Sequence, residues 1–238
     1  MATVYQHGTL GMLMEGLFAG TITWAEVLKH GDTGIGTLAG LNGEVIVING
    51  EVYQGEASGK VNHITDLSTT TPFATVAFFD ENAVTMTLPA TDEGGLDRFA
   101  EEQQIQNTFA LFELHGSFKH VKIRIAPKSE EPYPTLAEVA DNQPEFEADE
   151  IDGTLLGFFS PALYEGAVVA GWHLHFISDD RTFGGHLLDY TAGDLEGNYQ
   201  IFDDFNLHLP IQNQAFRDYH QDMQGLAESI RAAEGTAE

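Results

Sequence analysis

Residues 171–186 read GWHLHFISDDRTFGGH, and this stretch decides how the rest of the chain is interpreted. Side chains of a strand alternate between its two faces, so His173 and His175 share the face opposite the apolar residues at 172, 174 and 176. The polar, glycine-ended segment 178–185 predicts a loop, after which His186 opens a second apolar run. A hairpin would bring His186 back beside the first two histidines. Three imidazoles with no fourth protein ligand form the ligand set of a catalytic zinc site, which keeps one position open for water or substrate.

The histidine pattern favours metal ligation over a purely structural role. A single histidine on a strand is usually a core or surface residue, whereas two on one face of the same strand favour a shared ligand. Imidazole ligands also bind Fe, Ni, Cu or Mn, so the spacing alone leaves the metal open. The other histidines show no ligand spacing and are expected to be structural; they lie at positions 7, 30, 63, 115, 120, 208 and 220.

Composition restricts the class of partner. The 238 residues include 37 acidic and 10 basic side chains, for a formal charge of −27, and no cysteine. Nucleic acids and anionic membranes are bound through basic patches, so we expect neither as a partner. The absence of cysteine excludes disulfides, cysteine-ligated zinc and a thiol nucleophile. No run has the length of a transmembrane helix, and residues 1–6 lack the features of a signal peptide, so we expect a cytoplasmic protein.

Turn signals divide most of the chain into strands. Asn42-Gly43 and Asn49-Gly50 lie close enough together to predict a three-stranded antiparallel meander. Further strands are predicted at 72–80, 83–88, 110–114 and 117–126. A capping-box pattern at 23–26 predicts a helix over 24–30, and a second helix is expected over 95–107.

The chain also suggests an internal duplication. Residues 152–158 read DGTLLGF and echo HGTLGML at 7–13. We therefore expect an α+β fold with two related halves, each a mixed or antiparallel β-sheet with flanking helices, packed as one body. The predicted halves are an N-terminal α/β domain over 1–148 and a C-terminal α/β domain over 149–238. The second would carry the three-histidine site and a C-terminal helical tail over 213–233.

Several motifs resemble those of bacterial α-acetolactate decarboxylases. The three-histidine segment followed by FDDFN at 202–206 is similar to that family. So are GIGT at 34–37, LNGE at 41–44, and GSFKHVKIR at 116–124 with PYP at 132–134 after it. The likeness runs in the family's order from residue 7 to about residue 210.

The resemblance implies a carboxy-lyase of acetoin biosynthesis and the butanediol pathway. Such an enzyme would convert (S)-2-acetolactate to (R)-acetoin and CO2 through a metal-bound enediolate that is protonated on one face. It would be built as two α/β domains, usually as a homodimer, with a small 2-hydroxy-3-keto acid as its partner. Zn2+ would be held by His173, His175 and His186.

The same resemblance implies roles for further residues. It assigns Arg124 as a catalytic and substrate-binding arginine, Glu44 as an active-site glutamate and Thr37 as a substrate-binding residue of the pocket. The family also has a glutamate from its C-terminal tail, for which Glu234 is the better match here and Glu228 the alternative.

The reaction needs residues of these types. Loss of CO2 pushes two electrons toward the ketone, and a Lewis acid stabilises the resulting charge. A planar arginine fork suits the substrate carboxylate. A glutamate in a partly buried pocket can supply a proton to one face of the enediolate.

Two other functions remain open from the sequence. One is a cupin-like metal-dependent oxygenase or isomerase, since His173-x-His175 followed by acidic residues and a glycine loosely resembles a cupin motif; that motif, however, expects a glutamate where this chain has aspartates. The other is a non-enzymatic sensor module with a structural metal, although structural zinc usually has a fourth ligand.

Overall fold

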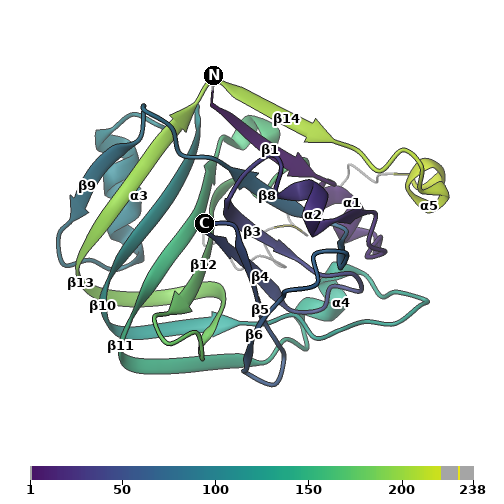
Figure 1. Ribbon diagram of the computed structural model, residues 1–238, viewed down its shortest axis with the longest axis horizontal. Coiled ribbons are helices and arrows are strands. Elements are labelled where there is room, and N and C mark those ends of the chain that lie inside the picture. The colour runs from purple at the N-terminus through teal and green to yellow at the C-terminus, as the bar shows by residue number, and fades with distance from the viewer. Residues whose placement is uncertain (1, 221–229, 231–238) are drawn as a thin grey trace.

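The computed structural model describes residues 2–220 and residue 230, and it shows two large β-sheets packed together with short helices around them (Figure 1). The sheets are mostly antiparallel, so the expected α+β class with mixed or antiparallel sheets is confirmed. No helix in these described ranges has the length and apolar character needed to cross a membrane.

The first sheet contains seven strands in the order β14-β1-β8-β3-β4-β5-β6. Their bounds are β14 (Asp204–His208), β1 (Thr3–His7), β8 (Ala74–Ala77), β3 (Thr33–Thr37), β4 (Glu44–Ile48), β5 (Glu51–Gly55) and β6 (Val61–His63). Strand β14 pairs in parallel with β1, and every other pairing in this sheet is antiparallel. The predicted meander is confirmed as β3-β4-β5, with positive φ angles of 52° at Asn49 and 76° at Gly50 in the second turn.

The second sheet is built from long strands that close on themselves. It runs β10-β11-β12-β13-β9, and β10 also pairs with β13. The bounds are β9 (Val84–Leu88), β10 (Phe109–Arg124), β11 (Glu145–Ser160), β12 (Gly171–Ser178) and β13 (Gly184–Phe202). Register shifts between β10 and β13, such as the one between Lys122 and Ile123, allow the sheet to bend, because an extra residue in one strand increases its local twist.

The remaining elements are short. The helices are α1 (Leu10–Met14), α2 (Trp24–Val27), α3 (Glu93–Glu102), α4 (Leu136–Ala140), α5 (Gln214–Asp218) and a 3-10 turn at Ala162–Tyr164; β2 (Ile22–Thr23) pairs with β7 (Thr70–Thr71). Thr23 is confirmed as the N-cap, since its hydroxyl accepts from the Glu26 amide at 3.3 Å, but α2 ends at Val27 rather than at residue 30.

The C-terminal helix is shorter than predicted. α5 ends at Asp218 because Tyr219 adopts an extended conformation with ψ at 149°. A single helix over 213–233 is therefore wrong in its first part, while 221–229 and 231–238 lie outside the described residues.

The main inter-sheet core positions the functional region. Ile35 and Ile46 of the first sheet pack in one buried cluster with Leu111, Leu156 and Ile177 of the second. This packing brings the carboxyl end of β3 and the start of β4 against the strands that carry the histidines.

The strands group into sheets without following their order in the chain. Residue 148 lies inside β11, which pairs with β10 along most of its length, and β14 returns to the first sheet beside β1. The two related halves divided at 148 and 149 stay a prediction.

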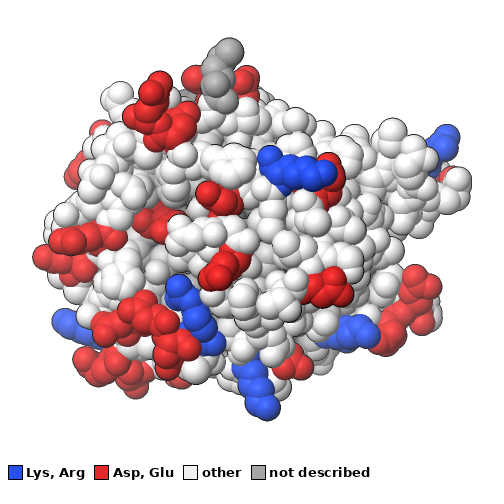
Figure 2. Space-filling view, viewed as in Figure 1, with Lys and Arg blue, Asp and Glu red and all other residues white. Residues whose placement is uncertain are grey.

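Acidic side chains outnumber basic ones on one face of the molecule. Figure 2 shows them gathering toward the lower left, over the region where β10, β11 and β13 lie in Figure 1. Basic side chains on this face are scattered singly, so this side presents no basic patch of the kind that binds nucleic acid.

Candidate metal centre and active site

The register of β12 and β13 brings the three histidines together. His175 lies directly opposite His186, and His173 shares the face of His175 because it is two residues away. The ligand atoms of His173, His175 and His186 all lie within 4.8 Å of one another. The predicted hairpin return of His186 is therefore confirmed, and the group could hold a metal ion.

His175 provides the strongest indication that the group fits a metal. Its Nδ1 lies 3.0 Å from the Val45 carbonyl oxygen, which only accepts, so the ring donates from Nδ1 and carries its lone pair on Nε2. That Nε2 is buried and has no hydrogen-bond partner in the described part of the chain. A buried lone pair without a donor is a destabilising feature that a bound metal cation would remove.

Two of the three histidines are held in the neutral form that metals require. Burial, and next the positive charge of Arg124, lower the pKa of His173 from 6.5 to about 3. Burial also lowers the pKa of His175 well below its ordinary value, with His173 as the next cause. Because metal ions bind unprotonated imidazole, these two rings need lose no proton at neutral pH to become ligands.

Glu44 reaches the histidines from the other sheet. Its Oε1 accepts from the Ala126 amide at 3.1 Å, and its Oε2 lies 3.6 Å from Nε2 of His175. The preceding residue, Gly43, has a φ of 80°, and a Cβ there would lie 2.2 Å from the Gly55 carbonyl oxygen, so the tight turn before β4 requires glycine. The turn thus directs the Glu44 side chain toward the second sheet.

Thr37 lies opposite Glu44 in the β3–β4 register and lines the same pocket. Its hydroxyl donates to the Gly43 carbonyl oxygen at 2.7 Å. The proton of the Thr37 hydroxyl is therefore used by the backbone, and the oxygen can act toward the pocket as an acceptor.

Arg124 is brought to the site by pairing between β10 and β13. It lies opposite His186, and its Nη2 donates to Nε2 of that ring at 3.2 Å. The polar residues that line the pocket include Thr37, Glu44, Arg124, His173 and His186, and the apolar ones include Leu10, Leu13, Leu41, Phe73 and Leu136.

Sequence reasoning missed one polar residue of this pocket. Gln143 lies between α4 and β11 and also lines it. No motif singles out this position, because its approach to Arg124 depends on pairing between β10 and β11.

The predicted tail glutamates, Glu234 and Glu228, lie outside the described residues. Ile230 is described, and its side chain is only 2% exposed. It packs in a cluster with Leu10, Leu13 and Phe73, which also line the pocket, so the chain returns to the pocket wall at this position.

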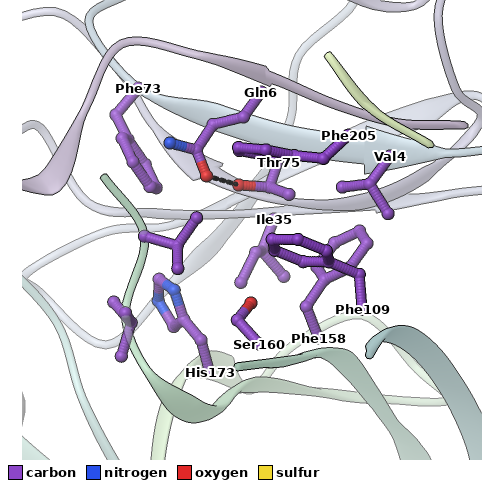
Figure 3. A pocket seen from close by; sticks show the side chains of 12 residues that line it. Val4, Gln6, Ile35, Phe73, Thr75, Phe109, Phe158, Ser160, His173 and Phe205 are labelled. Atoms are coloured by element: carbon purple, nitrogen blue, oxygen red, sulfur yellow. Dashed lines mark hydrogen bonds between the residues drawn. The ribbon is translucent and has the colours of Figure 1, made fainter. Parts of the chain in front are cut away.

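A small cavity lies between the sheets on another side of His173. Figure 3 shows Gln6 and Thr75 from the first sheet facing Ser160 and His173 from the second, with a 3.2 Å hydrogen bond from the Thr75 hydroxyl to Gln6 Oε1. Its volume of about 10 Å³ suffices for roughly one water molecule. This cavity therefore leaves no room for an organic ligand beside His173.

Comparison with known proteins identifies similar sequences over nearly the whole chain. The profile of the family described as Alpha-acetolactate decarboxylase matches residues 4–223. An alpha-acetolactate decarboxylase from Lactococcus lactis subsp. lactis is 36% identical over 232 residues, which cover 97% of this chain and 98% of the relative. One from Streptococcus thermophilus is 38% identical over 217 residues, or 90% of each protein.

Solved structures show the same fold. The alpha-acetolactate decarboxylase of Bacillus subtilis strain 168 superposes with a TM-score of 0.93 at 31% identity, over 98% of this chain and 100% of that one. A Staphylococcus aureus protein of unknown function, described as similar to alpha-acetolactate decarboxylase, gives 0.91 at 37% identity over the same shares.

Proposed function

The chain belongs to the alpha-acetolactate decarboxylase family, as its motifs indicated, and from this premise we propose that it converts (S)-2-acetolactate to (R)-acetoin and CO2 with a zinc ion held by His173, His175 and His186. The observation that carries the metal assignment is the buried Nε2 of His175, whose lone pair meets no donor among the residues described. The three rings contribute no negative charge, which suits a cation that must attract electrons.

The metal supplies one part of the chemistry. A zinc ion bound there provides Lewis-acid stabilisation for the negative charge that develops on the ketone oxygen as CO2 leaves. The pocket residues then have to hold the substrate in one orientation, exclude water and deliver a proton to one carbon atom.

Arg124 binds and orients the substrate carboxylate. A guanidinium offers two parallel N–H donors that match the two oxygens of a carboxylate. Decarboxylation requires the breaking carbon–carbon bond to align with the π system of the ketone, so holding the carboxylate sets the reactive conformation. The position of Arg124 opposite His186 supports this role. Thr37 contributes to binding as a pocket residue.

Glu44 handles the proton. Loss of CO2 leaves an enediolate, and a single product hand requires that one acid reaches only one of its faces. The bond between Glu44 Oε1 and the Ala126 amide supports this role, because it restrains the side chain on a rigid strand end. Glu234 would assist as the tail carboxylate, with Glu228 as the alternative.

The wider setting follows the family resemblance. We infer a homodimer, a cytoplasmic location and a small-molecule substrate, with no nucleic-acid partner. The cupin-like oxygenase or isomerase and the non-enzymatic sensor have no support from the family match, which covers residues 4–223.

A metal analysis tests the proposal. Wild-type protein is expected to contain one zinc ion per chain and to release CO2 and acetoin from acetolactate, whereas His175→Ala should lose both properties. His115→Ala is the matched control, because His115 is exposed and contacts Asp179 on the surface. Equal zinc contents in wild type and His175→Ala would contradict the assignment.

A further inference from the structure

Gln143 lies beside Arg124 through the pairing of two strands. In the β10–β11 register Arg124 lies opposite Glu145, and continuing this register by two residues sets Gln143 opposite Ala126. Positions two residues apart on a strand share a face, so Gln143 falls on the face of Arg124. The backbone is restrained there, since Ile125 donates its amide to the Pro144 carbonyl at 3.1 Å.

The side-chain amide of Gln143 has an unused acceptor. Its Oε1 is buried and accepts no hydrogen bond within the described ranges, although the side chain lines the pocket. The neighbouring polar groups are held differently: Thr37 donates to Gly43, and Glu44 accepts from Ala126. A buried carbonyl oxygen without a donor is rare in folded proteins, because it loses its bonds to water and gains none in return.

The chemistry of the substrate class identifies the donor. In a 2-hydroxy-3-oxo acid the carboxylate and the ketone can only accept hydrogen bonds, and the hydroxyl is the one group that can donate. Arg124, which can only donate, suits the carboxylate. An acceptor on the same face as that arginine therefore suits the adjacent hydroxyl.

We propose that Gln143 is a specificity-determining residue whose Oε1 accepts a hydrogen bond from the substrate's tertiary hydroxyl group. This inference rests on the proposed function, since it assumes that the pocket binds such an acid. A site that hydrogen-bonds a substrate hydroxyl discriminates against analogues lacking it, because the protein acceptor is then left buried and unpaired. Gln143 thus separates 2-hydroxy acids from 2-alkyl-3-oxo acids of the same size.

A thermodynamic cycle tests this assignment by changing the side chain at position 143 and the hydroxyl group of the ligand, separately and together. The probes are 2-hydroxy-2-methylbutanoate and 2-methylbutanoate, neither of which has a ketone, so neither can decarboxylate by this route. Their dissociation constants are measured calorimetrically with zinc-loaded wild type and Gln143→Leu. We expect the wild-type preference for the hydroxy acid to fall about tenfold in the variant, as is typical for one neutral hydrogen bond lost to a buried partner.

Matched variants separate recognition from structure. Gln143→Glu keeps an acceptor at similar length and should retain the preference, while Asn142→Ala, at the neighbouring exposed position, should leave all the constants unchanged. If Gln143→Leu does not fold, Gln143→Met provides an apolar side chain of similar length for the same cycle.

Different results would contradict the role of Gln143 and the proposed function. Equal weakening of both ligands by Gln143→Leu or Gln143→Met, or loss of the preference in Gln143→Glu or Asn142→Ala, would overturn the role of the Gln143 amide. Failure of the wild type to form acetoin from acetolactate would instead overturn the proposed function.

Discussion

Replacing Glu44 by glutamine is the sharpest test of the proton-handling role. The side chain is 13% exposed, Oε1 accepts from the Ala126 amide at 3.1 Å, and Oε2 lies 3.6 Å from Nε2 of His175. A glutamine has one accepting end and one donating end. Because the Ala126 amide needs an acceptor, the glutamine oxygen should replace Oε1, with its NH2 group in place of Oε2. The fold and the backbone contact are then retained, and only the acidic proton is lost.

The magnitude follows from what a positioned acid contributes. General acid catalysis typically provides about 10²- to 10⁴-fold, so Glu44→Gln should slow acetoin release by roughly 100-fold or more. Zinc content should stay normal, because the three histidine ligands are unchanged.

Product handedness gives the more discriminating assay. An enediolate without its acid is protonated by water on both faces, so the residual acetoin should be racemic by chiral chromatography. Glu51→Gln is the control, because Glu51 is an exposed glutamate of the same hairpin that accepts from the Tyr53 hydroxyl. Near-normal formation of pure (R)-acetoin by Glu44→Gln would refute the reasoning and make Glu234 the next candidate.

Three further predictions concern other parts of the chain. Arg124→Lys should keep zinc and fold but lose most turnover, because lysine lacks the bidentate fork; turnover within a few-fold of wild type would refute the role. Deleting residues from Gly225 onward should lower turnover more than the melting temperature, and Glu234→Gln separates loss of the carboxylate from loss of the buried Ile230; full activity after the deletion would contradict the tail's role. Burial, and next His208, lower the pKa of His7 from 6.5 to about 4. An unfolded chain therefore binds this proton first as the pH falls. The free energy of unfolding thus decreases as the pH falls from 6.5 toward 4, and at pH 5 it is about 2 kcal/mol smaller than above pH 6.5. Scanning calorimetry at pH 7 and 5 should show a smaller loss for His7→Gln, and an equal loss would count against this account.

Local patterns in the sequence were sufficient for the parts of the site that lie within one hairpin. Strand alternation sets His173 and His175 on one face, and a short loop returns His186 to them, because covalent geometry leaves few alternatives over so short a distance. The Asn-Gly pairs likewise predicted the meander of the first sheet, since Gly43 and Gly50 both adopt the positive φ that glycine tolerates best. The family motifs added Arg124, Glu44 and Thr37 by resemblance, without showing how they meet.

Only the tertiary structure decided how these residues meet. The contact of Arg124 with His186 spans 62 residues, that of Ala126 with Glu44 spans 82, and that of His175 with Val45 spans 130. The position of Gln143 depends in the same way on the β10–β11 register. Which distant strands pair, and in which register, is determined by burial of apolar faces summed over the whole molecule, and a one-residue slip would turn every side chain to the opposite face. No local pattern encodes that sum, which is why the sequence determined the ligand set and the packing of the two sheets determined the pocket around it.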